Sequence, residues 1–263
     1  MDLQLKNKNF IVTGGAKGIG AAIAFELAKE GALPIIIGRN QHDNENIQTA
    51  IHAAGGQCAT FEAELNERTD YAALHQRITT QFKEIHGIVN NAGANDGVGL
   101  KNGNIDLFVK SIHKNVTHYF GTVQCFLNEL IQTKGAIVNI SSKVAETGQG
   151  GTSGYAAANG ARNALTREWA VELIPYAIRV NAVVVAESFT PLYQEWIKTL
   201  PAPDETLKKI ISSIPFENRM TKPEEIAHMV LFLLSKLSSH TTGQIIHVDG
   251  GYVHLDRAIT HIK

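Results

Sequence analysis

The chain reads Phe10-Ile11-Val12-Thr13-Gly14-Gly15-Ala16-Lys17-Gly18-Ile19-Gly20 near its amino terminus. An apolar run leads directly into a glycine-rich turn, and apolar residues then recur at helical spacing at Ile19, Ile23 and Leu27. Glycines in such a turn let the backbone approach a pyrophosphate, which the free N–H groups of the helix start attract. A tight strand-to-helix turn without a ligand is the alternative interpretation. No Gly-Lys-Ser/Thr follows, which disfavours a nucleoside-triphosphate loop.

Short apolar runs alternate with longer helical patterns along the rest of the chain. Seven runs are predicted strands: Phe10–Val12, Pro34–Ile37, Gln57–Phe61, Gly87–Val89, Ala136–Ile140, Ile178–Val185 and Gln244–Val248. Most are apolar throughout, as in parallel sheets covered by helices on both faces. The pattern predicts a single α/β domain over 1–263, a Rossmann-like, doubly wound parallel sheet of about seven strands. The proline-rich residues 187–216 interrupt the alternation and are predicted to form a substrate loop.

The composition excludes several classes of protein. The 24 Lys and Arg residues against 25 Asp and Glu give a net charge of −1, which is too little basic charge for a dedicated nucleic-acid binder. The longest apolar runs are far shorter than the roughly 20 residues that span a membrane, and the first residues lack the apolar core of a signal peptide. Cys58 and Cys125 have no metal-ligand spacing. We therefore expect a cytoplasmic protein that binds neither nucleic acid nor membrane.

Five motifs follow one another along the chain. They are Thr13-Gly14-x-x-x-Gly18-Ile19-Gly20, Asn90-Asn91-Ala92-Gly93, Ile137-Val138-Asn139-Ile140-Ser141-Ser142, Tyr155, and Thr242-Gly243 followed by Val248-Asp249-Gly250-Gly251. In this order they resemble the short-chain dehydrogenase/reductase family, from about residue 5 to residue 252. The resemblance implies a cofactor half over about 1–140, a catalytic and substrate half over about 141–263, and a homotetramer.

The resemblance also implies contacts to a nicotinamide dinucleotide. It assigns them to Gly14, Lys17, Gly18, Ile19, Gly20, Arg39, Glu64, Asn91, Ala92, Gly93, Tyr155, Asn159 and Thr190. An acidic residue after the second strand favours NAD, whereas Arg accommodates the 2′-phosphate of NADP. Arg39 occupies that position and Lys17 adds a second cation. We expect NADP(H) to be preferred and NAD(H) to be possible; in the alternative, Arg39 stacks on adenine and Lys17 is a solvated loop charge.

The spacing of three polar residues matches the family's catalytic set. Ser142 follows Asn115 by 27 residues, and Tyr155 follows Ser142 by 13. In the family, a phenolate removes the proton of a substrate hydroxyl, a serine hydroxyl holds the substrate oxygen, and a hydride leaves for nicotinamide. The family's fourth residue is a Lys four positions after the Tyr, and here that position is Asn159.

The missing lysine removes a charge from the expected site. A free tyrosine titrates near pH 10, so only about one in 10³ is phenolate at pH 7 without a nearby cation. Two cations are candidates to replace it. Lys143 follows Ser142 directly, and strand alternation predicts that it faces away. Arg162 shares the helical stripe of Tyr155 but is about 10 Å along the axis. Asn159 therefore predicts reduced activity or, alternatively, a nucleotide-binding scaffold or sensor.

Residues near the predicted carboxyl ends of strands indicate a polar substrate. Asn95, Gln149 and Glu187 are candidate hydroxyl partners beside Ser142 and Tyr155, and Trp196 is a candidate sugar-stacking residue or a loop-packing anchor. Several stretches, including Asn95-Asp96-Gly97 and Thr190-Pro191-Leu192-Tyr193, resemble the L-fucose dehydrogenase-like group of sugar dehydrogenases. The resemblance implies oxidation of an L-fucose-like aldose.

Histidines recur at 247, 254 and 261, with a spacing of seven residues. No Cys, Glu or His-Glu-x-x-His context accompanies them in the sequence, and the repeat crosses from a predicted strand into the tail. We therefore predict no metal site.

Overall fold

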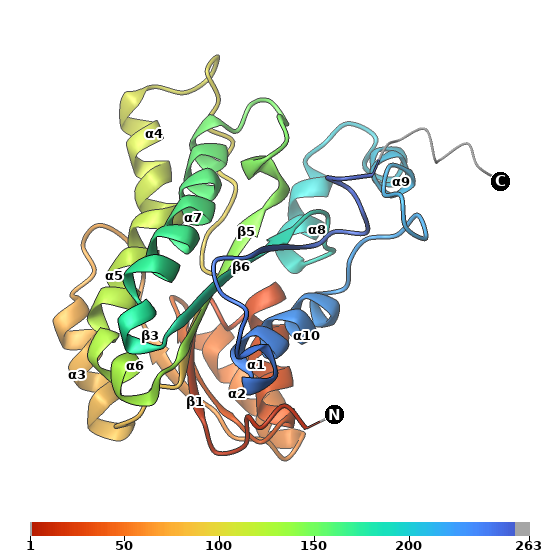
Figure 1. Ribbon diagram of the computed structural model, residues 1–263. Coiled ribbons are helices and arrows are strands. Elements are labelled where there is room, and N and C mark those ends of the chain that lie inside the picture. Colours follow the sequence, from red (N-terminus) through yellow and green to blue (C-terminus); the bar gives the residue numbers. More distant parts are fainter. Residues whose placement is uncertain (1, 256–263) are drawn as a thin grey trace.

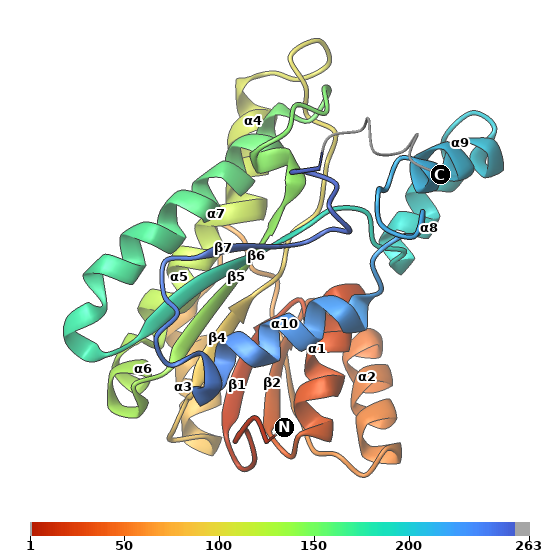
Figure 2. The same cartoon turned by 45° about the vertical axis from the view of Figure 1, so that its right-hand side comes forward.

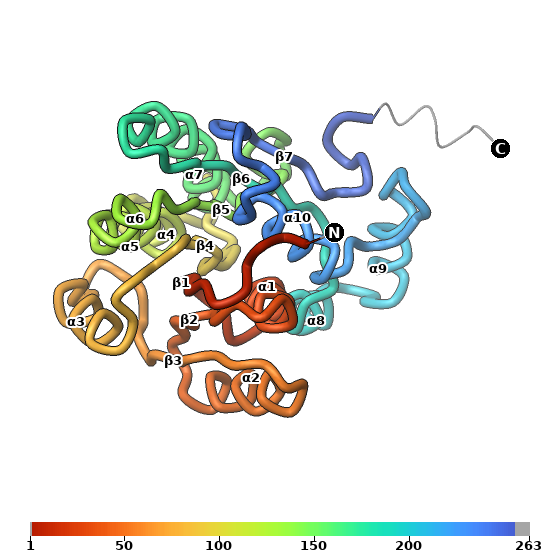
Figure 3. Tube along the Cα trace, turned by 60° about the horizontal axis from the view of Figure 1, so that its bottom comes forward, coloured from red at the N-terminus to blue at the C-terminus, as the bar shows by residue number. Residues whose placement is uncertain are grey.

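A computed structural model describes residues 2–255 of the chain. In this part, seven parallel strands form one sheet in the order β3-β2-β1-β4-β5-β6-β7, as Figure 3 shows along the strands. The strands are β1 (Asn9–Thr13), β2 (Leu33–Gly38), β3 (Ala59–Glu62), β4 (Gly87–Asn90), β5 (Ala136–Ser142), β6 (Arg179–Val185) and β7 (Ile245–Val248). The predicted single-domain α/β fold is confirmed, and the predicted strand boundaries are correct to within two residues at each end.

Helices cover both faces of the sheet (Figures 1 and 3). One face carries α3 (Tyr71–Gln81), α4 (Ile105–Ile112), α5 (His118–Cys125), α6 (Leu127–Thr133) and α7 (Ser153–Glu172). The other carries α1 (Gly18–Lys29), α2 (Gln41–Ala53) and α10 (Pro223–Leu234). Separate apolar cores fill the space on the two sides. The five central strands β2, β1, β4, β5 and β6 are largely buried, which explains why most of the strands are apolar throughout.

The proline-rich stretch predicted as a loop is largely helical. It contains α8 (Pro191–Lys198) and α9 (Pro203–Ser212), each with a proline in its first turn, where the missing N–H costs no hydrogen bond. Figure 2 shows both helices projecting beyond the end of the sheet, beside the segment that follows β7. This placement puts them at the carboxyl ends of the strands, where ligands of such sheets bind.

Among the helices of residues 2–255, none combines the length and the apolar character that crossing a bilayer requires.

Candidate active site

The glycine turn between β1 and α1 has a backbone that side chains would obstruct. Gly14 and Gly18 have φ angles of +63° and +55°, in the left-handed region that favours glycine. A Cβ on Gly20 would lie 2.2 Å from the carbonyl oxygen of Gly14. The turn therefore keeps the amino terminus of α1 close to the end of β1. This is the geometry that lets backbone N–H groups contact a pyrophosphate, so the turn fits a dinucleotide.

The Asn90–Gly93 motif at the end of β4 holds this turn in place through hydrogen bonds. The Asn91 amide donates to the carbonyl oxygens of Thr13 and Gly14 at 3.0 and 3.2 Å. The Thr13 hydroxyl accepts from the backbone N–H groups of Asn91 and Ala92 at 2.9 and 3.1 Å. Gly18 lies next to Thr190, because a Cβ added at Gly18 would be 3.3 Å from the Thr190 methyl carbon. The structure thus brings together the predicted cofactor residues of three separate loops.

Two cations lie at the end of β2 that would face the adenosine ribose. Arg39 is exposed directly after the strand. Lys17 forms an ion pair of 2.8 Å with Asp43 in the first turn of α2, so part of its charge is already neutralised. Glu64 is exposed two residues after β3. Of the two cations, Arg39 is therefore the freer to bind a 2′-phosphate through its guanidinium.

Asn115 lies in a π-helical turn, His113–Thr117, between α4 and α5. Single π-turns within α-helices are frequent at functional sites. The Asn115 side chain is fully buried, accepts from the Ala94 N–H at 2.8 Å and donates to the Ser111 carbonyl at 3.0 Å. Both bonds hold the loop after β4 against α4, so Asn115 positions the wall of the site.

Ser142 ends β5, and Tyr155 lies in the first turn of α7, which packs on β5 and β6. Asn159, one helical turn after Tyr155, is buried. Its amide donates to the Tyr155 carbonyl at 2.8 Å, and its side-chain oxygen accepts from Arg162 Nη1 at 3.0 Å. The position occupied by Lys in the family is therefore a neutral link between Tyr155 and an arginine.

The Arg162 guanidinium lies much closer to Tyr155 than the axial distance predicted. Its Cζ is 6.0 Å from the Tyr155 ring centroid and 4.4 Å from that of Tyr119. The prediction of about 10 Å counted only the rise between the two Cα positions, whereas helical side chains lean toward the amino terminus and Arg is long. A Cβ on Gly93 would lie 2.6 Å from Arg162 Nη2. The cation therefore lies between Tyr155 and the cofactor wall.

Arg162 is buried among neutral acceptors. Its Nε donates to the Asn115 carbonyl at 2.7 Å, Nη2 donates to the same oxygen, and Nη1 donates to the Ile140 carbonyl at 3.1 Å. Among residues 2–255 no carboxylate forms an ion pair with it. Burial, and then the Arg162 charge, lowers the pKa of His118 to about 3, so that neighbour is neutral at pH 7. Buried charges are usually paired, so this one is available to an anion.

Lys143 does not face away from the site, contrary to the strand-alternation argument. β5 ends at Ser142, and Lys143 begins a 3-10 turn, Lys143–Ala145, so alternation no longer applies. The ammonium forms a largely buried ion pair with Glu187 in the loop after β6 and lies 4.0 Å from the Tyr252 ring centroid. Burial, together with the Glu187 charge, raises the pKa of Tyr193. Glu187 is thus a neutralised acceptor rather than a free carboxylate.

The other predicted substrate residues differ in how they are placed. Asn95 is exposed, and its side chain accepts from the Gly97 N–H at 3.1 Å. Gln149 lines a cavity of about 340 Å³ formed by residues 144–153 and Ala156. Trp196 on α8 is 42% exposed and packs edge-on against Tyr193, with ring centroids 5.0 Å apart. Trp196 has both a packing partner and a free face.

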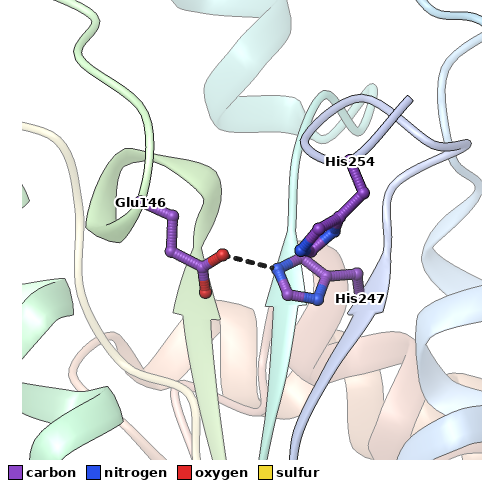
Figure 4. Close-up of side chains that lie close together, drawn as sticks. All are labelled: Glu146, His247 and His254. Carbon is purple, nitrogen blue, oxygen red and sulfur yellow. Dashed lines mark hydrogen bonds and ion pairs between the residues drawn. The ribbon is translucent and has the colours of Figure 1, made fainter. Parts of the chain in front are cut away.

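One side-chain group combines two histidines of the seven-residue repeat with an acidic residue that the sequence did not reveal, at a place where no metal site was predicted. His247 and His254 lie beside Glu146, which precedes His247 by 101 residues (Figure 4). His261, the third member of the seven-residue repeat, lies outside the described residues. The repeat was the available signal, but the acidic partner is visible only once the chain is folded.

The family model described as enoyl-(acyl carrier protein) reductase, a division of the short-chain dehydrogenases, matches residues 14–253. The chain belongs to the short-chain dehydrogenase/reductase family. The chain is an NAD(P)-dependent oxidoreductase of this family. The 3-oxoacyl-acyl-carrier-protein reductase of Thermotoga maritima is 31% identical over 95% of this chain and 100% of that protein.

Three solved structures of this family are similar over almost the whole chain. Cj0485 dehydrogenase is 41% identical, with a TM-score of 0.91 and 98% of each chain covered. A protein described as an NAD(P)-dependent gluconate 5-dehydrogenase from Beutenbergia cavernae, with NADP bound at low occupancy, is 26% identical, with a TM-score of 0.88 and coverage of 97% and 100%. The aldohexose dehydrogenase of Thermoplasma acidophilum is 26% identical, with a TM-score of 0.87 and coverage of 97% and 98%.

Proposed function

We propose that this short-chain dehydrogenase oxidises a sugar hydroxyl with NADP, using Tyr155 as the base and Arg162 as the cation that stabilises its phenolate. The observation that carries the proposal is the buried guanidinium of Arg162, which has neutral hydrogen-bond partners and lies 6.0 Å from the Tyr155 ring centroid. An uncompensated buried cation beside a tyrosine stabilises the ionised form of that tyrosine.

The residues of the chain have separate roles in the proposed reaction. Tyr155 takes the proton of the substrate hydroxyl while the Ser142 hydroxyl donates to the same oxygen and orients it. A nicotinamide cofactor, when bound, would supply the acceptor for the hydride that leaves the carbinol carbon. Asn159 and Asn115 position Arg162 through its Nη1 and Nε hydrogen bonds. Residues from about 1 to 140 supply most of the proposed cofactor contacts, and residues from about 141 to 263 supply the base and most of the proposed substrate contacts.

The cofactor preference is proposed from Arg39. The exposed guanidinium follows β2 directly, whereas Lys17 is paired with Asp43. We expect Arg39→Asp to weaken NADP binding on the order of tenfold to a hundredfold and to leave NAD binding unchanged or tighter, because the carboxylate repels a phosphate and accepts from ribose hydroxyls. Calorimetric titration with both nucleotides measures this. Lys83→Asp, at the opposite end of the sheet, is the control. Equal affinities of the unaltered protein for the two nucleotides would contradict the proposal.

An L-fucose-like aldose is the proposed substrate because polar groups gather at the carboxyl ends of the strands. Gln149 lines the cavity there, and the Lys143–Glu187 pair offers both a donor and an acceptor. Aldohexose and gluconate dehydrogenases among the similar structures support this class. A second candidate, a hydrophobic hydroxyl or keto compound, is favoured by the exposed Phe189 and Leu192 near α8 and by the acyl-carrier-protein reductase relative.

A panel of substrates separates these two candidates. We expect NADP reduction with L-fucose and its stereochemical relatives at a kcat/KM at least about tenfold above that with simple aliphatic alcohols, since unpaired polar groups in a site penalise a substrate without matching hydroxyls. Absorbance of the reduced nicotinamide provides the measurement. Activity confined to hydrophobic alcohols and ketones would reject the sugar and leave the second candidate. Nucleotide binding without turnover on any member would favour the scaffold interpretation.

A homotetramer in the cytoplasm remains our proposal for the state and location of the protein. The helices α4 and α5 expose apolar side chains at Ile105, Leu107, Phe108, Val109 and Phe120, with Ile105 78% exposed. A monomer rarely exposes so many apolar residues on neighbouring helices. These residues and the α7 helix beside them form the face that the proposed subunit contact would cover (Figure 1).

A further inference from the structure

We propose that Glu146, His247 and His254 bind a divalent transition-metal ion of the zinc type, at a site separate from the proposed hydride-transfer residues. The three side chains come from three segments. Glu146 follows the 3-10 turn after β5, His247 lies in β7, and His254 lies in the segment after β7. Figure 4 shows the carboxylate and both imidazoles pointing toward one another.

The distances support a common ligand. One potential ligand atom of each residue lies within 4.8 Å of the other two, and His247 Nε2 lies 3.0 Å from Glu146 Oε2. Two atoms bonded to one zinc ion at about 2.1 Å are separated by at most about 4.2 Å, and by less in a tetrahedron. The exposed His254 needs only a small rotation of its side chain to reach that geometry, because the two imidazole centroids are already 4.3 Å apart.

The chemistry of the group is that of a zinc site rather than a calcium or magnesium site. Two imidazole nitrogens and one carboxylate oxygen are the donor set of zinc sites that keep a fourth position for water. The second Glu146 oxygen accepts from the Asn163 amide at 3.4 Å, which orients the carboxylate as outer partners do in metal sites. The neighbouring Lys143 ammonium is compensated by Glu187 and does not compete for Glu146.

The position of the group indicates what the ion would do. Glu146 belongs to the lining of the cavity that Gln149 shares, whereas His247 and His254 belong to the carboxyl-terminal part of the chain. An ion bound to all three would tie the segment after β7 to the loop after β5. We therefore infer that the ion would fix one wall of the cavity and would have no part in the transfer of hydride.

The test uses the full-length, untagged protein with Zn²⁺ and Co²⁺ as probes. We expect one tightly bound Zn²⁺ per chain by calorimetry, a Co²⁺ complex with the visible absorption of a four-coordinate site, and a higher Tm with either metal. Glu146→Gln, His247→Gln and His254→Gln should each weaken Zn²⁺ binding on the order of 10²-fold or more and abolish the Co²⁺ spectrum. His240→Gln, which alters an exposed histidine elsewhere, should change neither.

Two results would overturn the proposal. One is the absence of stoichiometric binding by the unaltered protein, which would leave the group as a Glu–His hydrogen bond with a ring contact. The other is an equal loss of affinity in the His240 variant, which would show that surface histidines bind the metal without a defined site. The Tm of each metal-free variant shows whether it is folded, and the exposed His254 variant provides the test with the least structural disturbance.

Discussion

Arg162→Gln is expected to lower kcat at pH 7 by about 10²- to 10³-fold while NADP still binds. The substitution removes the charge beside Tyr155 and keeps a side chain that can hydrogen-bond, so the loss reports the charge. Arg162→Lys should lose less, because an ammonium remains in the same space. The measurement is steady-state kinetics with the best substrate of the panel, together with calorimetry for the nucleotide.

Loss of stability could imitate this effect, and Arg179 provides a matched control. Arg179 is half-buried, and its guanidinium donates to the Leu233 and Ser235 carbonyls at 2.7 and 3.1 Å, at the other end of the sheet. Arg179→Gln should lower the Tm as Arg162→Gln does, since both leave buried carbonyls without a donor. It should leave kcat within about twofold. Similar losses of kcat in both variants would assign the effect of Arg162 to folding.

Tyr155→Phe is expected to lower kcat by about 10³-fold or more, because the variant has no group to accept the substrate proton. The aromatic ring remains, so the first turn of α7 and the Asn159 amide bond to the carbonyl of residue 155 are preserved. NADP affinity should stay within a few-fold. Tyr176→Phe, at an exposed tyrosine of the 3-10 turn Ile174–Tyr176 that follows α7, is the control. A Tyr155→Phe enzyme with kcat within tenfold of the original would show that another group takes the proton.

Much of the fold was predictable because its signals are local. The apolar strand β1, the positive-φ glycines 14 and 18 and the α1 helix lie within twenty-one consecutive residues, Asn9–Lys29. The helical character of α8 and α9 was missed because their prolines were interpreted as loop residues. In the structure each proline stands in a first turn, where it is compatible with a helix.

The candidate-site residues that belong to a sequence motif could be predicted. Those whose position depends on the length and direction of a side chain could not. Asn115, Ser142 and Tyr155 came from their spacing. The distance from Arg162 to Tyr155 was overestimated, since spacing along an axis says nothing of a long side chain that leans back toward the helix start. Lys143 was placed on the wrong side because the end of β5 at Ser142 cannot be located from alternation. The nearness of Glu146 to His247 depends on the sheet order, which brings β5, β6 and β7 together.

The measurement that tests the role of Arg162 most directly is kcat against pH for four proteins: the unaltered enzyme, Arg162→Gln, Asn159→Lys and the double variant. All are compared with the same sugar and saturating NADP. We expect Arg162→Gln to lower kcat at neutral pH by about 10²- to 10³-fold. The double variant should restore neutral turnover, because it places an ammonium one helical turn from Tyr155. Asn159→Lys alone should bring no gain, since it replaces the oxygen that accepts from Arg162 Nη1 at 3.0 Å with a second buried cation. A rise of about 10²-fold in neutral kcat for Asn159→Lys alone, with Arg162→Gln unchanged from the original enzyme, would contradict the account.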